Sequence, residues 1–169
     1  MSHEVLGLTG GEEYSFKVRA LNIYGQGDFS TPISQRLSNI PNKPSMVTVT
    51  LVGTDVQIAW VAPDSNFSPI NDYLVELMTH SGDWVTDLTN CDGGLEPNFS
   101  SLNCQIPMVD IAPLTSLTID TLIRARVSAH NANGWSEPSE PNISGQVVHT
   151  VPLQMDPVSI DPVADVSNT

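Results

Sequence analysis

Basic residues are scarce in this chain, and charged residues of both signs are few. Charged side chains make up 15% of the 169 residues, and 19 acidic residues stand against 6 basic ones, which gives a formal net charge of -13. Phosphate binding needs clustered Lys and Arg. Nucleic acid is therefore not expected as a partner, and an anionic membrane surface is disfavoured for the same reason.

Long apolar runs and sustained helical spacing are also missing. No apolar stretch approaches the roughly 18 residues of a membrane span, so we expect no membrane insertion in this segment. Thirteen prolines and eleven glycines, together with abundant Ser, Thr and Asn, divide the chain into short alternating runs. This pattern predicts an all-β fold. Residues 1–10 lack the basic and then apolar pattern of a secretion signal, so a secreted protein would need one outside this chain or already removed.

No constellation of catalytic residues stands out. The four histidines are scattered along the chain. The carboxylates form no spaced pair on a convincing cleft, and no glycine-rich phosphate loop opens a helix. We therefore expect a protein that is not an enzyme and that has no cofactor.

The most informative feature that is present is an internal repeat. An alternating strand pattern followed by a turn glycine occurs twice, at an offset of 109 residues. Such a pattern is typical of a strand near the end of a β-sandwich unit, yet the first copy lies almost at the amino terminus. Only one complete module fits between the copies, which are Tyr14-x-Phe16-x-Val18-x-Ala20-x-Asn22-x-x-Gly25 and Ile123-x-Ala125-x-Val127-x-Ala129-x-Asn131-x-x-Gly134.

This repeat divides the chain into four predicted segments. Residues 1–37 correspond to the last three strands of a partial module, and residues 38–45 to a linker that contains two X-Pro pairs. Residues 46–150 form the complete module, with Trp60, Tyr73 and Val127 predicted to point into its core. Residues 151–169 form an extended tail rich in Pro and Asp, at the place of the first strand of a following or neighbouring module.

The chain resembles the fibronectin type III family. The residues that carry the resemblance are Leu8-x5-Tyr14 with the strand that follows it, the strand residue Trp60, the turn at Pro63 and the strand residue Tyr73. The Leu-x5-Tyr spacing suits a corner whose tyrosine hydroxyl bonds back to the upstream backbone. The resemblance implies a seven-stranded, immunoglobulin-like sandwich, used in extracellular tandem arrays for spacing and adhesion, without catalytic chemistry.

Four departures from the family pattern are visible. Ile123 takes the place of the corner tyrosine in the complete module, and no Arg-Gly-Asp adhesion tripeptide occurs. The repeat is longer than a typical module, and we expect the extra length in the loop between Cys91 and Cys104. Family modules usually lack disulfides.

Cys91 and Cys104 are predicted to form a disulfide bond. An even cysteine count in a secreted-type β-domain favours a local bridge, and the alternative is a pair of buried free thiols in a cytosolic protein. Zinc is not expected, because no second Cys or His pair lies nearby.

Three sites fit the N-glycosylation pattern, and all fall in predicted turns or loops. They begin at Asn66, Asn98 and Asn142, and Pro69 should hinder use of the first. Asp156 and Asp161 in the tail are compatible either with calcium binding between modules or with a solvated acidic linker.

A partial module should expose the apolar face of Tyr14, Phe16 and Val18 unless something covers it. The tail of another copy could supply an edge strand through Val158, Ile160 and Val163, which would join subunits head to tail. A chain cut from a longer tandem array would explain the same pattern.

We therefore expect an extracellular or cell-surface structural subunit or segment of a fibre or coat. Its expected partners are other copies of itself or adjacent modules, and N-linked glycans. The alternative is an adhesion or carbohydrate- or protein-binding module of a receptor or secreted enzyme, with Trp84 or Trp135 as contacts.

Overall fold

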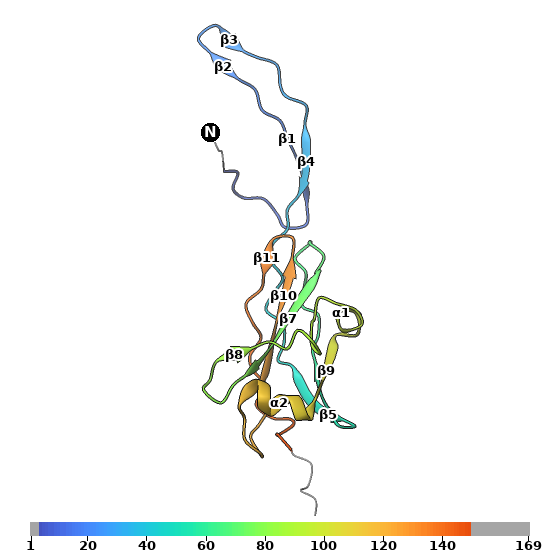
Figure 1. Cartoon of the computed structure of the whole chain (residues 1–169). Coiled ribbons are helices and arrows are strands. Elements are labelled where there is room, and N and C mark those ends of the chain that lie inside the picture. The colour runs from blue at the N-terminus through green and yellow to red at the C-terminus, as the bar shows by residue number, and fades with distance from the viewer. Residues whose placement is uncertain (1–3, 150–169) are drawn as a thin grey trace, which may run out of the picture.

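The computed structural model describes residues 4–149, which form a narrow N-terminal ribbon and a β-sandwich. The ribbon projects away from one end of the sandwich (Figure 1), and the linker after β4 joins the two. All of the strand pairings are antiparallel. The predicted all-β class is confirmed.

The sandwich consists of two antiparallel sheets. One sheet has the order β5-β6-β9, and the other has the order β11-β10-β7-β8. Together they provide the seven strands that the family resemblance implies, so the predicted sandwich is confirmed. The strands are β5 (Thr48–Val52), β6 (Asp55–Ala59), β7 (Asp72–Met78), β8 (Trp84–Val85), β9 (Asn103–Pro107), β10 (Ala125–Asn131) and β11 (Gly134–Trp135).

Strict alternation along the strands produces the core. In β7, every second residue from Tyr73 to Leu77 is buried, because successive side chains of a strand point to opposite faces. The predicted core residues Trp60, Tyr73 and Val127 are 5%, 4% and 0% exposed. The Trp60 and Tyr73 rings lie 5.5 Å apart and tie the ends of the two sheets together.

Two segments complete the last edge of the sandwich. Residues 146–148 pair with residues 121–123 through an antiparallel bridge between Leu122 and Val147. Residues 136–142 run along β10, with Ser136 and Ser139 facing it. Their backbone amides donate to Ala129 O and Val127 O at 2.8 and 2.9 Å, while their hydroxyl oxygens accept from the amides of the same two residues. Side-chain oxygens thus replace backbone acceptors in a segment where proline limits regular pairing.

Two short helices were not predicted. They are α1 (Asn98–Ser101), within the cysteine loop, and α2 (Met108–Thr115), after β9. A four-residue helix leaves no periodic signal, and Pro113 inside α2 is unusual for a helix interior. The extra length of the repeat is therefore divided between the cysteine loop and α2, rather than confined to the loop.

The N-terminal part is a ribbon of two long arms rather than three strands. Its paired segments are β1 (Glu13–Phe16) with β4 (Ile33–Arg36) and β2 (Leu21–Asn22) with β3 (Gly25–Gln26). Residues 4–12 form no strand. A strand needs a partner edge, and the described residues offer none at that place.

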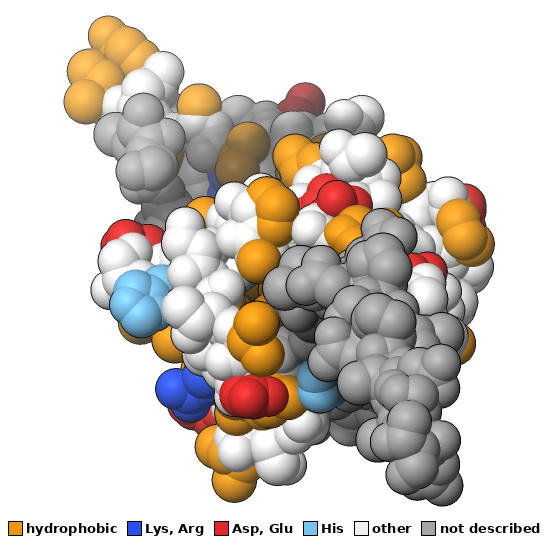
Figure 2. Space-filling view, turned by 60° about the horizontal axis from the view of Figure 1, so that its bottom comes forward, with side chains coloured by type: hydrophobic (Ala, Val, Ile, Leu, Met, Phe, Trp, Pro, Cys, Tyr) orange, Lys and Arg blue, Asp and Glu red, His pale blue; other side chains and the backbone are white. Residues whose placement is uncertain are grey.

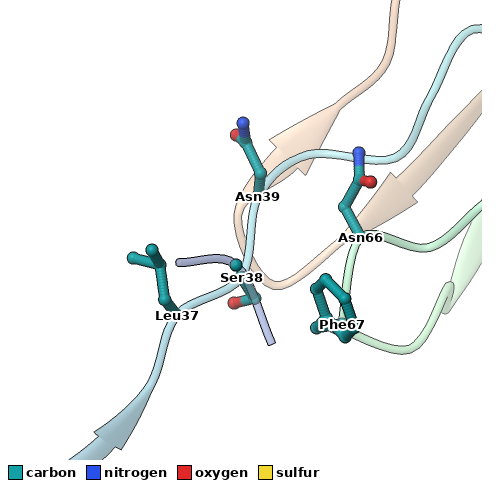
Figure 3. Close-up of a pocket in the computed structure, with 6 residues that line it drawn as sticks. Leu37, Ser38, Asn39, Asn66 and Phe67 are labelled. Atoms are coloured by element: carbon teal, nitrogen blue, oxygen red, sulfur yellow. The ribbon is translucent and has the colours of Figure 1, made fainter. Parts of the chain in front are cut away.

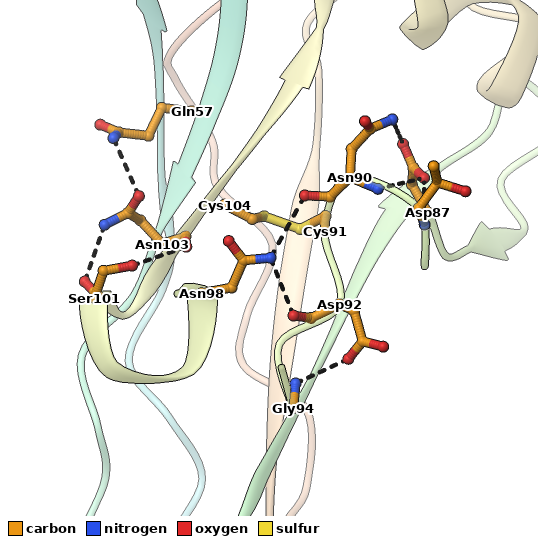
Figure 4. The surroundings of a disulfide bond; sticks show 11 residues. Gln57, Asp87, Asn90, Cys91, Asp92, Gly94, Asn98, Ser101, Asn103 and Cys104 are labelled. Carbon is orange, nitrogen blue, oxygen red and sulfur yellow. Dashed lines mark hydrogen bonds between the residues drawn. A yellow bond between two sulfur atoms is a disulfide. The ribbon is translucent and has the colours of Figure 1, made fainter. Parts of the chain in front are cut away.

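Cys91 and Cys104 are joined by a disulfide bond and are 2% and 1% exposed (Figure 4). The loop that they close is also held by non-covalent contacts. Asn98 donates to the carbonyl of Asp92 at 3.1 Å, and the Phe99 ring lies 5.7 Å from that of Tyr73.

We expect the double substitution Cys91→Ala with Cys104→Ala to lower the free energy of unfolding by about 3 kcal/mol, because the unfolded chain regains the entropy of the open loop. Urea unfolding without reductant measures this difference. Addition of reductant to the native chain should lower its stability to that of the variant. A variant as stable as the oxidised native chain would contradict the prediction.

Candidate functional site

The junction between the ribbon and the sandwich is the part of the structure with the densest long-range polar contacts. It contains an open cleft of about 350 Å³ between the base of the ribbon and the loop that precedes β7 (Figure 3). The cleft is lined by Gly10, Leu37, Ser38, Asn39, Asn66 and Phe67.

Asn131 is the central residue of this junction. It ends β10 and is 0% exposed. Its side-chain amide donates to Asn39 O at 2.7 Å, to Ser65 O at 3.0 Å and to Ser68 O at 3.3 Å. One buried side chain therefore joins the linker to the loop before β7, and buried amides of this kind are expensive to leave unpaired.

Two further asparagines hold the linker on either side. The side chain of Asn133 donates to Ser38 Oγ at 3.0 Å and to Asn39 O at 3.1 Å. The side chain of Asn66 donates to the backbone oxygen of Ile40 at 2.7 Å. The backbone amide of Asn39 in turn donates to Asn66 O at 3.0 Å. These contacts of Asn131, Asn133 and Asn66 with the linker are called the linker clamp below.

The linker itself lies on the sandwich. Pro41 and Pro44 are both buried, and Lys43 forms an exposed ion pair with Glu140 at 2.5 Å. The hydrogen bond from Lys43 holds the pKa of Glu140 below its usual value. Proline rings that pack against the module remove the freedom that a linker would otherwise have.

Phe67 connects the sandwich to the base of the ribbon. Asn66 and Phe67 have φ angles of 49° and 66°, which are strained for residues other than glycine. This backbone places the Phe67 ring against the turn of Gly10 and Gly11. A Cβ atom at Gly11 would lie 2.5 Å from the ring, closer than any real contact.

The tyrosine corner at the base of the ribbon is confirmed. The Tyr14 hydroxyl accepts a hydrogen bond from the amide of Thr9 at 2.7 Å. Thr9 lies five residues upstream of Tyr14, and this bond fixes the turn that contains Gly10 and Gly11.

Of the three ribbon residues predicted to form the assembly face, only Val18 is exposed. Val18 is 73% exposed, whereas Val127, its repeat counterpart, is 0% exposed, and the neighbouring Ile33, which was not predicted, is 67% exposed. Tyr14 and Phe16 are half-buried. Val158, Ile160 and Val163, and the tail aspartates, lie outside the described residues.

The three glycosylation candidates use their side-chain amides inside the fold. Asn142 is 1% exposed and donates to Ile123 O and Ser144 O, so the prediction of a glycan there is wrong for the folded chain. The side-chain amide of Asn66 donates to the linker residues Ile40 and Asn42. Asn98 donates to carbonyl oxygens of its own loop.

The two aromatic residues suggested as ligand contacts are partly engaged by neighbours. The Arg126 guanidinium lies 4.0 Å above the Trp84 ring and forms a bidentate pair with Glu76. The Trp135 ring lies 4.7 Å from that of His130. Both pairs lie on the outer face of the sheet that contains β7 and β10.

Metal and membrane chemistry find no support in the part of the chain that is described. Residues 4–149 contain no group of three or more His, Cys, Asp or Glu side chains that could hold a metal ion. Among the same residues, neither helix has the length and apolar character needed to cross a bilayer.

Acidic side chains outnumber basic ones on the face shown in Figure 2.

Comparison with known proteins agrees with the fold. No family model matches the chain. Human myomesin-2 is 30% identical over 145 residues, which cover 82% of this chain and 9% of myomesin-2. The chain is similar to the fibronectin type III/immunoglobulin-like domain regions of such proteins. Among solved structures, domains A168–A170 from titin align with a TM-score of 0.50 at 24% identity, over 83% of this chain and 44% of the titin chain.

The likeness of the fibronectin type III-like chain to these relatives supports a structural, modular segment. It spans less than a tenth of the length of the curated relative that it matches. Myomesin and titin are intracellular sarcomeric proteins of muscle. The predicted extracellular or cell-surface location is therefore contradicted, and the comparisons do not support the expected fibre, adhesion or glycan attachment.

Sequence reasoning missed the junction of the fibronectin type III-like module. The repeat drew attention to Asn22 and Asn131 as turn residues, and both do accept a backbone amide two residues on. The additional role of Asn131 depends on residues 63 to 92 positions away in sequence. A signal was available in the asparagines of residues 39–42 and 131–133, at the two ends of one module.

We expect Asn131→Ala to lower the free energy of unfolding by about 3 kcal/mol, because three backbone carbonyl oxygens each lose a hydrogen bond from a buried side chain. Asn22→Ala is the matched control, since the same repeat position on the ribbon is exposed and accepts only the Tyr24 amide. It should cost less than about 0.5 kcal/mol. Chemical denaturation of both variants measures the difference, and equal effects would contradict this role of Asn131.

Asp72 gives the module a pH-dependent stability. Burial raises the pKa of Asp72, and nearby Asp92 adds to the effect. A carboxyl with a raised native pKa stabilises the fold when protonated, and this contribution is lost as the pH rises through that pKa. We expect Asp72→Asn to raise the melting temperature at pH 7 and to leave it almost unchanged at acidic pH. Thermal unfolding across this range tests the sign, and a melting temperature lowered at pH 7 would contradict it.

Proposed function

We propose that this chain is a stiff spacer in a modular structural protein, in which sandwich modules follow one another head to tail in a fixed relative orientation. The observation that carries the proposal is the clamp of Asn131, Asn133 and Asn66 on the linker. A linker with free backbone groups would let its neighbours turn independently. Here the carbonyls of Asn39 and Ile40 are bound to the sandwich.

The proposed function does not involve binding of a small ligand. Drug-sized ligands usually occupy about 300–1,000 Å³. The open cleft at the junction, of about 350 Å³, lies at the lower end of this range, and the second described cleft, near His80 and Arg124, of about 190 Å³, lies below it. The proposal assigns the chain a mechanical role without catalysis. Its partners are adjacent modules of the same kind.

Residual dipolar couplings test the stiffness of the junction. In the native chain, we expect couplings from residues 13–36 and 46–148 to fit one alignment tensor, because the two parts form one body. Asn133→Ala removes two linker contacts and should separate the tensors without unfolding the module.

Asn103→Ala is the matched control for this experiment, because the side chain of Asn103 bonds only within the sandwich: it donates to Ser101 O at 2.9 Å and accepts from Gln57 at 3.3 Å. Its couplings should still fit one tensor. Two tensors in the native chain would reject the proposed stiffness.

Strand donation is a second candidate for how such segments associate. The exposed face of Val18 and Ile33 favours it, and the charge distribution supports it. The ribbon carries three of the six basic residues, Lys17, Arg19 and Arg36, whereas residues 151–169 carry three Asp and no basic residue. The apolar tail residues named above could cover the face of a second copy.

Sedimentation velocity over a concentration series tests this candidate. We expect the full chain to associate and a chain ending at residue 150 to remain monomeric, because the donated segment is gone. Val18→Ser should also weaken association, while Val61→Ser, at a residue 66% exposed on the sandwich, should not. Association that persists in the shortened chain would reject donation by the tail.

A further inference from the structure

The two corners of the internal repeat are structurally equivalent. In the first copy, Gly11 N donates to Leu37 O at 2.9 Å and Leu37 N to Glu12 O at 3.0 Å. In the second copy, Asp120 N donates to Val148 O at 3.0 Å and Val148 N to Thr121 O at 2.9 Å. Gly11 and Asp120 both have positive φ angles, 84° and 63°.

The first corner is occupied by the module that follows it. Phe67 lies so close to Gly11 that a Cβ atom there would approach the ring atoms Cε1, Cζ and Cδ1 to between 2.5 and 2.9 Å. At Gly10, a Cβ atom would come no nearer than 3.4 Å. With the Phe67 ring in this position, there is no room for a side chain at position 11, whereas a small side chain fits at position 10.

The second corner cannot form the same contact. It carries Ile119 and Asp120 where the first carries Gly10 and Gly11, and Ile119 is 56% exposed. Since the backbone of Asp120 repeats that of Gly11, its Cβ occupies the space that an incoming aromatic ring would need.

We propose that Gly11 and Phe67 form a recognition pair that fixes the order of modules, and that the corner of Ile119 and Asp120 rejects a module presenting phenylalanine at this loop position. This inference rests on the proposed function, since it concerns the specificity of the same junction. The inference excludes a uniform array in which every copy of this module docks on the previous copy through the same contact. The module that docks on the second corner carries a residue smaller than phenylalanine at that loop position.

A chain with a duplicated module tests the pairing directly. A second copy of residues 38–148 is inserted after Val148, the equivalent of Leu37, so that its Phe67 meets Ile119 and Asp120 of the first copy. Spin labels at Gln26→Cys and Gln105→Cys report on the first joint, and labels at Gln105→Cys of both copies report on the second. Pulsed electron spin resonance then gives the distance distribution across each joint.

We expect one narrow distance peak across the first joint and loss of that narrow peak across the second. Ile119→Gly with Asp120→Gly in the first copy should restore a narrow peak at the second joint, and Phe67→Ala in the inserted copy should abolish it again. A narrow peak at the second joint with Ile119 and Asp120 in place would overturn the inference. So would a broad peak in the diglycine variant.

The reciprocal substitution in the original 169-residue chain gives an independent arm if the duplicated chain folds poorly. Gly11→Asp should broaden the distance distribution across the first joint while the melting temperature of the sandwich stays unchanged. Gly10→Ala is the control, and its distance distribution should stay narrow. A narrow distance distribution across the first joint in Gly11→Asp would reject the recognition pair. A broad distribution across the same joint in the native sequence would instead reject the proposed stiffness, so the two failures are distinguishable.

Discussion

The buried side-chain amide of Asn131 is the contact on which the arrangement of the ribbon and the sandwich depends. It lies at the end of a central strand, where the turn to β11 begins, and it joins three backbone carbonyls from two other segments. Asn39 O and Ser65 O each also accept a second hydrogen bond, from the side chain of Asn133 and from Ser68 N, but Asn131 is the side chain that joins both segments. The linker therefore has one favourable path across the end of the module. Because the ribbon precedes the linker directly, its orientation relative to the sandwich is fixed as well.

The sides of the sandwich are protected from pairing, in contrast to its ends. Residues 136–142 close the edge of β10 with hydroxyl oxygens and prolines, so that few backbone groups remain to receive another strand. The surplus of acidic side chains also opposes lateral contact between copies. Modules of this kind are suited to association through their ends, which is where the described junction lies.

The cysteine loop shows how a disulfide is combined with other contacts. Asn98 and Phe99 hold the same loop that the bridge closes, and Gly93 packs directly against Tyr73, where a Cβ atom would lie 2.4 Å from the Tyr73 carbonyl oxygen. The loop geometry is thus supported by packing as well as by the covalent bond. This combination matters because the sarcomeric relatives contradict the oxidising, extracellular setting from which the bridge was first inferred.

The sequence by itself determined the elements whose signals are local and periodic. Alternation placed β7 and β10, the repeat located one complete module, and the Leu-x5-Tyr spacing identified the tyrosine corner, because each signal lies within a few residues. The short helices gave no such signal, and the edge at residues 136–142 could not be recognised because its hydrogen bonds use side chains. Only the tertiary structure decided that Asn131 binds the linker, that Asn142 is buried and that Phe67 lies on Gly11. These contacts join residues distant in sequence, and no local preference of either partner encodes them.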